Sequence, residues 1–282
     1  MSDYRSGKKK KVRYHFSLVF FAAVLIFGFM FFRYMKTTTL EEVLSEDRDI
    51  TLPALSFNSQ DKDDEQNGVE DDAQPTVNSE IINPVAESEA ADKSYFDSCV
   101  FIGDFIPYGM SSYEVVPTTS VYASMSMNLS NADAQAVETQ FGSMTVLEAL
   151  EKKSFENVYI MLGSNDAASM TVSDMYTDYI AFANKIKAAC TNSRIFIVSV
   201  PPVTDAKEQS KTSPISNADI NSFNEKLLDY ANSNNMYYLD VNTYFKNENG
   251  MMPADLAEND GLHFKYSAYE KLSDYILSHT AK

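Results

Sequence analysis

The chain has 282 residues, 44% of them hydrophobic, which is enough for one domain of ordinary size together with additional segments. Its formal net charge is −17, and the Lys and Arg residues cluster near the N-terminus, so the rest of the chain lacks the basic surface that nucleic-acid binding requires. The two cysteines, the three histidines and the glycines form neither a metal-ligand cluster nor a phosphate-binding loop. We therefore expect no metal, no other cofactor and no nucleic-acid partner.

The N-terminal segment predicts a membrane anchor. Six Lys and Arg residues between positions 5 and 13 precede an apolar run over residues 16–32, which contains no charged residue. A helix of this length spans about 25 Å, at the short end of what crosses a bilayer. The basic residues predict that residues 1–15 are a cytoplasmic tail. A cleaved signal peptide is the alternative, but no small-x-small cleavage site follows the run, so we favour an uncleaved signal anchor.

Residues 33–93 have the composition of a flexible acidic linker. Acidic runs occur at 61–65 and 70–72 among Ser, Asn, Gln and Pro, and apolar residues are sparse. Such a segment cannot bury enough surface to offset the entropy of ordering it. We expect this linker to hold a domain over residues 94–282 away from the outer face of the cell membrane.

From residue 94 onward, strands alternate with helices. In chain order, the pattern predicts a strand over 99–102, a short strand over 121–123, a helix over 145–153, a strand over 157–162, a helix over 172–189, a strand over 194–200, a helix over 219–232, a strand over 237–241 and a helix over 267–278. The strands are nearly continuous apolar runs, which is typical of a parallel sheet buried on both faces. We therefore predict an α/β fold, a three-layer sandwich with a central parallel sheet.

Both cysteines, Cys99 and Cys190, lie next to predicted strands. The simpler interpretation is that they are small buried apolar residues. A disulfide between them is possible outside the cytoplasm, but the sequence does not supply its geometry.

Of three motifs, the first two lie where ligands bind in such folds, beyond the carboxyl ends of strands. Gly-Asp at 103–104 follows the first strand, Gly-Ser-Asn-Asp at 163–166 follows the strand at 157–162, and Asp-Gly-Leu-His at 260–263 precedes the last helix. Together and in this order they resemble the SGNH/GDSL hydrolase family, over residues 95–280. The resemblance implies a flavodoxin-like SGNH hydrolase fold and the ester-hydrolysing activity of bacterial extracytoplasmic lipases and acylhydrolases.

The resemblance also implies a role for each motif residue. His263 would be the general base, and Asp260 would orient it and stabilise its charged form. Asn165 would donate its side-chain amide to the developing oxyanion. Gly163 would belong to the same motif block as Asn165. Asp104 would belong to the Gly-Asp motif, where it could also cap the helix after the first strand.

Two parts of the family's machinery are missing. The residue after Gly-Asp is the serine nucleophile in the family, and here it is Phe105, whose ring can neither attack a carbonyl nor lose a proton. The family's second block normally contributes a glycine N–H to the oxyanion. We place this block at residues 122–127, where no glycine occurs and Ser126 is the closest equivalent.

We therefore expect an extracytoplasmic, single-pass membrane protein whose GDSL-like domain is impaired as an esterase and serves as a cell-surface binding or scaffolding module. The alternative is an active carboxylic-ester hydrolase, for example a polysaccharide O-acetylesterase, in which a relocated serine works with His263 and Asp260. Candidates for that serine are Ser111, Ser112, Ser124 and Ser126. The resemblance and the predicted location suggest envelope polysaccharide or another acylated molecule as the ligand.

Overall fold

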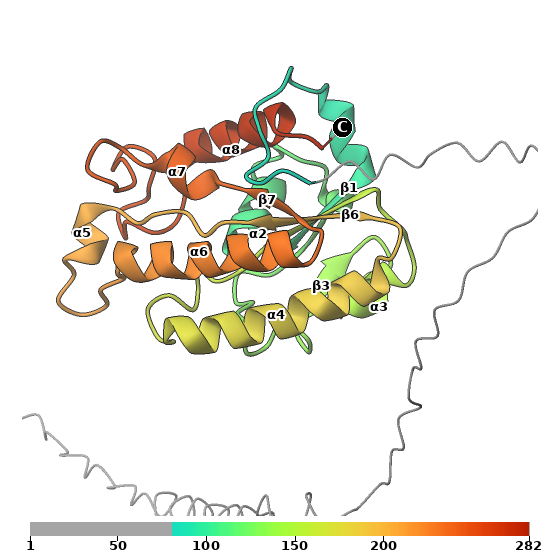
Figure 1. Cartoon of the computed structure of the whole chain (residues 1–282), viewed down its shortest axis with the longest axis horizontal. Coiled ribbons are helices and arrows are strands. Elements are labelled where there is room, and N and C mark those ends of the chain that lie inside the picture. The colour runs from blue at the N-terminus through green and yellow to red at the C-terminus, as the bar shows by residue number, and fades with distance from the viewer. Residues whose placement is uncertain (1–80, 282) are drawn as a thin grey trace, which may run out of the picture. The chain divides into compact units, whose positions relative to one another are not determined.

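The computed structural model describes residues 81–281 (Figure 1). The predicted cytoplasmic tail at 1–15, the predicted anchor at 16–32 and residues 33–80 of the predicted linker lie outside the described residues. Within the described part of the chain, no helix has both the length and the apolar character needed to cross a membrane.

Five parallel strands form the central sheet. They are β1 (Cys99–Gly103), β2 (Val121–Ala123), β5 (Asn157–Met161), β6 (Arg194–Val198) and β7 (Tyr237–Leu239), in the spatial order β2-β1-β5-β6-β7. Every residue of β1, β2 and β5 is buried, as expected for strands covered on both faces. The predicted α/β fold with a central parallel sheet is confirmed.

Helices cover both faces of this sheet, and alternate strand residues point to the two layers. On one face, α3 (Val146–Leu150), α4 (Val172–Ala189) and α6 (Asn217–Ser233) pack on a core that includes Ile102, Ile160 and Ile197. On the other face, α2 (Phe105–Ser112), α7 (Val241–Phe245) and α8 (Tyr266–Ser278) pack on a second core. Figure 1 shows α4 and α6 on one side of the sheet and α7 and α8 on the other.

The second core contains a row of stacked aromatic rings across four neighbouring strands. Phe101, Tyr159, Phe196 and Tyr237 lie in register on β1, β5, β6 and β7. Successive ring centroids are 4.8, 4.4 and 4.9 Å apart. Each such pair contributes roughly 0.5–1.5 kcal/mol beyond the burial of its area, so the row ties the middle of the sheet together.

The structure contains several short elements that the sequence pattern did not predict. They are the 3₁₀ helices η1 (Lys93–Ser98) and η2 (Thr118–Ser120), the hairpin of β3 (Ala136–Thr139) and β4 (Gly142–Thr145), and the short helices α5 (Asp205–Glu208) and α7. The predicted strand at 237–241 was too long, because the Asp240 side chain accepts from the Thr243 N–H and starts α7 there. The predicted helix at 219–232 was too short at its start, where Ser216 provides the N-cap.

The described residues of the predicted linker, 81–93, do not form a free tether. The N–H groups of Val85, Ser88 and Ala91 donate to backbone carbonyls of β7 and α8, and the side chains of Val85 and Ala91 pack against the second core. The domain therefore begins at or before residue 81 rather than at residue 94. Composition alone could not show this, because the segment gains its partners only from the folded sheet edge and the end of α8.

The two cysteines have different environments and neither is in a disulfide. Cys99 begins β1, is fully buried and donates its thiol to the Tyr95 carbonyl at 3.2 Å. Burial raises the pKa of this thiol to about 12. Cys190 follows α4 and is partly exposed, so only Cys99 is the buried apolar residue that the sequence predicts.

Candidate functional site

The first two motifs meet at the carboxyl ends of β1 and β5. Gly103, the last residue of β1, has φ 153°, and a Cβ placed there would lie 1.8 Å from the carbonyl oxygen of Met161. Only glycine permits this approach of the two chains. The Asp104 N–H donates to the same carbonyl at 3.2 Å, so the Gly-Asp turn is attached directly to the end of β5.

Asp104 joins the two motifs through its side chain, which is fully buried. One carboxylate oxygen accepts from the Ile106 N–H and thereby caps α2, and the other accepts from the Ser164 N–H, each at 3.1 Å. Burial raises the pKa of Asp104 to about 7, although these two N–H donors favour the charged form. Asp104 therefore holds the start of α2 against the 163–166 turn.

The side chains of Asn165 and Asp166 hold the loop that follows β2. Nδ2 of Asn165 donates to the carbonyls of Met125 and Met127 at 3.0 and 2.7 Å. The Asp166 carboxylate accepts from the Leu129 N–H at 3.1 Å, and burial raises its pKa to about 6. An amide nitrogen has two hydrogens, so both donors of Asn165 are engaged by this loop.

The same loop is the predicted second block. The Ser126 N–H lies 3.4 Å from the Ser124 hydroxyl, and the two serine hydroxyls are 3.3 Å apart. The oxyanion donors that the resemblance assigns to Asn165 and to the second block thus make contacts within the protein itself. An oxyanion could use them only by replacing these contacts.

His263 and Asp260 form a hydrogen-bonded pair. Nδ1 of His263 lies 2.6 Å from one Asp260 oxygen, and the other oxygen accepts from the Leu262 and His263 N–H groups at 3.0 Å. Burial raises the pKa of Asp260, but these N–H groups and the imidazole outweigh burial and hold the pKa below its usual value. The pair has the geometry of a base and its orienting carboxylate.

The tight turn at Gly261 fixes this pair. Gly261 has φ 72°, and a Cβ placed there would lie 2.2 Å from the Thr204 hydroxyl oxygen. The Thr204 N–H donates to the Gly261 carbonyl at 3.1 Å. The segment after β6 therefore clamps the turn that carries Asp260 and His263.

Phe105, the residue that the resemblance places at the nucleophile position, packs on His263. It is the first residue of α2 and is 1% exposed. The centroid of its ring lies 4.3 Å from that of the His263 imidazole, with 49° between the planes. The Phe105 carbonyl accepts from the Tyr269 hydroxyl at 3.4 Å. The structure thus brings Phe105, His263 and Asp260 together, with the apolar ring of Phe105 against the imidazole.

The four serines considered as relocated nucleophiles have other partners. Ser111 and Ser112 both donate to the Tyr108 carbonyl at 3.0 Å, within α2, and Ser124 and Ser126 contact each other. Among the hydrogen bonds between residues 81–281, the only side-chain partner of the His263 imidazole is Asp260.

Two residues support this site without any signal in the sequence. Tyr269 lies on the buried face of α8 and resembles an ordinary core residue, yet its hydroxyl contacts the backbone of Phe105. Thr204 follows a Pro-Pro-Val run, and only the structure shows that its N–H donates to the Gly261 carbonyl and so holds the 260–263 turn. Only the folded chain brings these residues to the site.

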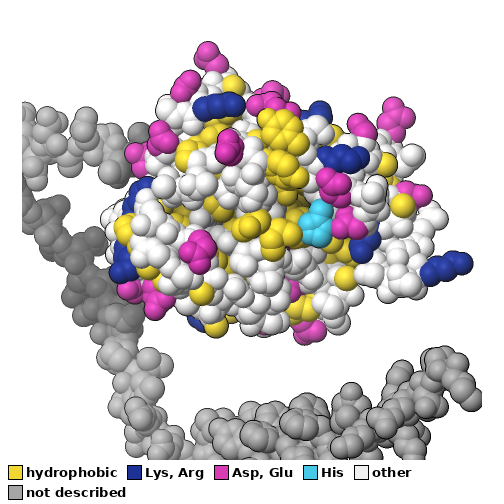
Figure 2. Space-filling model, turned by 180° about the vertical axis from the view of Figure 1, so that it is seen from behind, with side chains coloured by type: hydrophobic (Ala, Val, Ile, Leu, Met, Phe, Trp, Pro, Cys, Tyr) yellow, Lys and Arg dark blue, Asp and Glu magenta, His cyan; other side chains and the backbone are white. Residues whose placement is uncertain are grey.

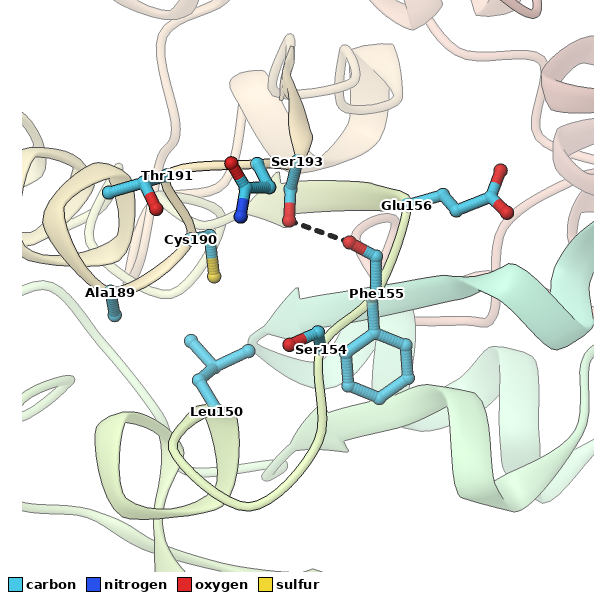
Figure 3. Close-up of a pocket in the computed structure, with 9 residues that line it drawn as sticks. Leu150, Ser154, Phe155, Glu156, Ala189, Cys190, Thr191 and Ser193 are labelled. Carbon is cyan, nitrogen blue, oxygen red and sulfur yellow. Dashed lines mark hydrogen bonds between the residues drawn. The ribbon is translucent and has the colours of Figure 1, made fainter.

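The surface around a histidine, a cavity away from the motifs and the grouping of possible metal ligands complete the description of the site. Figure 2 shows a face on which a histidine side chain lies among hydrophobic and acidic side chains. A cavity of about 270 Å³ lies away from the motifs (Figure 3). It is lined by the segment that precedes β5 and by the connection from α4 to β6, and its lining includes Ser154, Cys190, Thr191 and Ser193 but no motif residue. In the described part of the chain, no three His, Cys, Asp or Glu side chains are grouped so that they could hold a metal ion.

Comparisons with known proteins agree with this fold. The family model described as the GDSL-like Lipase/Acylhydrolase family matches residues 109–271. This is more than half of the chain. It includes the motifs at 163–166 and 260–263 and begins after Phe105. No curated protein matches the chain.

Several solved structures are similar to the chain. A protein from Streptococcus pneumonia, described as a candidate platelet activating factor, has a TM-score of 0.50 and 17% identity, over 63% of this chain and 81% of its own. A GDSL-like lipase from Bacteroides thetaiotaomicron VPI-5482 has a TM-score of 0.45 and 18% identity, over 65% and 87%. A carbohydrate esterase family 3 protein from Talaromyces cellulolyticus has a TM-score of 0.42 and 11% identity, over 63% and 92%. At these identities the similarity concerns the fold alone.

Proposed function

This chain belongs to the GDSL-like lipase/acylhydrolase family, and we propose that it is a member that does not hydrolyse esters and instead serves as a binding module. The observation that carries the proposal is the contact between Phe105 and His263. A buried phenyl ring packs on the imidazole with 4.3 Å between ring centroids. A serine hydrolase needs a hydroxyl within hydrogen-bond reach of the base, about 2.6–3.2 Å.

The state of the oxyanion donors supports the same conclusion. Both N–H groups of the Asn165 amide donate to loop carbonyls, and the Ser126 N–H faces the Ser124 hydroxyl. Stabilisation of an oxyanion depends on donors that are already oriented toward it and free to bind it. Here both donors would have to leave a partner, which lowers the stabilisation they could give.

The His263–Asp260 pair is retained and is open to solvent. The side chains of His263 and Asp260 are 36% and 48% exposed. Without a nucleophile, such a pair can still donate and accept hydrogen bonds at the carboxyl edge of the sheet, where ligands of α/β proteins bind. This supports a binding role at the position of the former catalytic site.

The proposed setting is the outer face of a cell membrane. Residues 16–32 would anchor the chain with residues 1–15 in the cytoplasm, as their apolar and basic composition suggests. The domain would then meet envelope polysaccharide or another acylated molecule. The support for this ligand class is the family together with the proposed location.

Esterase assays with three forms of the protein test the absence of hydrolysis. For the wild type we expect p-nitrophenyl acetate turnover no faster than the residual rate of a hydrolase without its nucleophile, and no fluorophosphonate labelling. Phe105→Ser should gain a slow activity, held down by the engaged oxyanion donors, and Phe105→Ser/His263→Ala should lose that gain. Ser111→Ala is a matched control that removes a nearby hydroxyl without touching His263.

Wild-type turnover at ordinary enzyme rates that is abolished by His263→Ala would refute the proposal. Fluorophosphonate labelling of Ser124 or Ser126 would refute it as well, because it would identify a relocated nucleophile. A serine hydrolase that lacks one triad member still accelerates hydrolysis about 10³–10⁴-fold over water. Only a rate above that level would therefore indicate a working nucleophile.

A further inference from the structure

A polar cavity lies beside β7, the last strand of the sheet, and extends past the carboxyl end of that strand. Its volume is about 290 Å³, and no residue of the three motifs lines it. Ligands of α/β proteins bind beyond the carboxyl ends of strands. Ligand pockets usually measure about 300–1,000 Å³, so this cavity has the size for a small molecule or for one unit of a larger one.

Two helices on opposite sides of the sheet form the walls of the cavity (Figure 1). The residues from α6 have the spacing i, i+3, i+4 and i+7, which places them on one face of the helix: Asn221, Asn224, Glu225 and Leu228. The opposite wall comes from α7 and the residues at its two ends: Asp240, Asn242, Thr243 and Lys246. Tyr238 and Pro84 complete the lining.

Two asparagine side chains are held in place by the backbone of Val200. The Asn224 side chain accepts from the Val200 N–H at 2.8 Å and donates to the Val200 carbonyl at 2.9 Å. Nδ2 of Asn242 donates to the same carbonyl at 2.8 Å. Both amides are therefore oriented before any ligand arrives.

The oxygen of the Asn242 side chain has no partner within the described part of the chain, although Asn242 is only 3% exposed. Among residues 81–281, the only sealed side-chain N or O atoms without a hydrogen bond are the hydroxyls of Tyr122 and Ser273. Oδ1 of Asn242 is therefore not sealed and can be reached from the cavity. It can accept a hydrogen bond from a ligand without breaking one inside the protein.

Other donors and acceptors around the cavity are also free. One Asp240 oxygen accepts from the Thr243 N–H at 3.0 Å, which leaves the second oxygen. The Glu225 carboxylate has no hydrogen-bond partner among the described residues. Asn221 Oδ1 accepts from Lys246 Nζ at 2.8 Å, which leaves the Asn221 NH₂ group and two hydrogens of the ammonium group. Two carboxylates stand against one ammonium group, so the lining disfavours phosphate and other anions.

We propose that this cavity binds one unit of a neutral saccharide. Each sugar hydroxyl donates and accepts hydrogen bonds, which matches a lining that offers free groups of both kinds. The apolar surfaces of Pro84 and Leu228 suit the C–H groups of a sugar ring. The site goes beyond the proposed function, because it uses neither His263 nor Asp260 and can be tested whether or not the domain hydrolyses esters.

Ligand-observed NMR with the full chain tests this inference. The protein is solubilised in a detergent without sugar head groups, and the probes are N-acetylglucosamine, glucose and galactose. We expect at least one of these sugars to bind with a Kd on the order of 1 mM, as for a small polar ligand, and inorganic phosphate not to bind. Glu225→Leu should weaken binding of that sugar at least about tenfold, the factor that corresponds to loss of a hydrogen bond to a charged group.

Asp229→Leu is the matched control, because Asp229 is an exposed carboxylate of α6 that does not line the cavity. It should bind the sugar as the wild type does. Asn242→Leu removes the unpaired oxygen and should also weaken binding, and Glu225→Leu alone decides if circular dichroism shows that Asn242→Leu does not fold. The inference is wrong if none of the three sugars binds at concentrations up to about ten times the expected Kd. Equal affinity of Glu225→Leu and the wild type, or binding of phosphate in place of the sugars, would also overturn it.

Discussion

Replacing Asp104 with Asn should show how strongly a buried carboxyl group changes the free energy of unfolding of this domain with pH. Asp104 is completely buried, and its pKa is raised from 3.8 to about 7. The folded state therefore holds a proton on this group over a pH range in which the unfolded chain has lost it. The resulting stability is fully present below the unfolded pKa and is lost as pH rises through the folded pKa.

The two pKa values set the size of the effect. Between pH 5 and pH 8, this one group should lower the free energy of unfolding by about 2.5 kcal/mol. Asn cannot ionise, so Asp104→Asn should remove this loss. At pH 5 the variant should be less stable than the wild type by about 1–3 kcal/mol, because an amide has one acceptor for the Ile106 and Ser164 N–H groups.

Urea denaturation between pH 5 and pH 8 measures this dependence. With an m value of about 2–3 kcal/mol/M, the wild-type midpoint should fall by about 1 M because of Asp104, and the variant's midpoint should fall by correspondingly less. The pKa of Asp166 is also raised, so the midpoints of both the wild type and Asp104→Asn should still fall somewhat with increasing pH. The exposed Asp97 gives the matched control, and Asp97→Asn should keep the wild-type slope. Identical slopes for Asp104→Asn and the wild type would refute this reasoning.

Two further substitutions test the turns that form the site. Gly261→Ala should lower the unfolding free energy by about 1–3 kcal/mol in urea denaturation, because its Cβ would lie 2.2 Å from the Thr204 hydroxyl. Gly250→Ala has a similar φ with open space around it, so an equal loss in both variants would rule out the steric clash as the cause. Asn165→Ala should cost about 1–3 kcal/mol by leaving the Met125 and Met127 carbonyls without their donor. Denaturation would measure this cost, and an unchanged midpoint would show that the amide does not hold the loop.

The N-terminal boundary illustrates where sequence reasoning ends. Residues 81–93 are polar and acidic and continue the composition of the preceding segment, so they are predicted as linker. Their order comes from the β7 edge and the end of α8, whose backbone groups need partners. The composition of a segment indicates how much apolar surface it can bury. It does not indicate which hydrogen-bond partners another part of the folded chain provides.

The sequence by itself determined the architecture, because buried parallel strands must be apolar along their whole length and helices must carry an apolar stripe. It also placed two of the motifs at strand ends and led to the prediction that Phe105 occupies the nucleophile position. Only the tertiary structure shows what surrounds these residues. The ring of Phe105 packs on His263, and the donors of Asn165 are used by the loop after β2. These contacts join residues that lie between 38 and 158 positions apart in the chain. No local pattern encodes such distances, since they result from how the sheet brings its strand ends together.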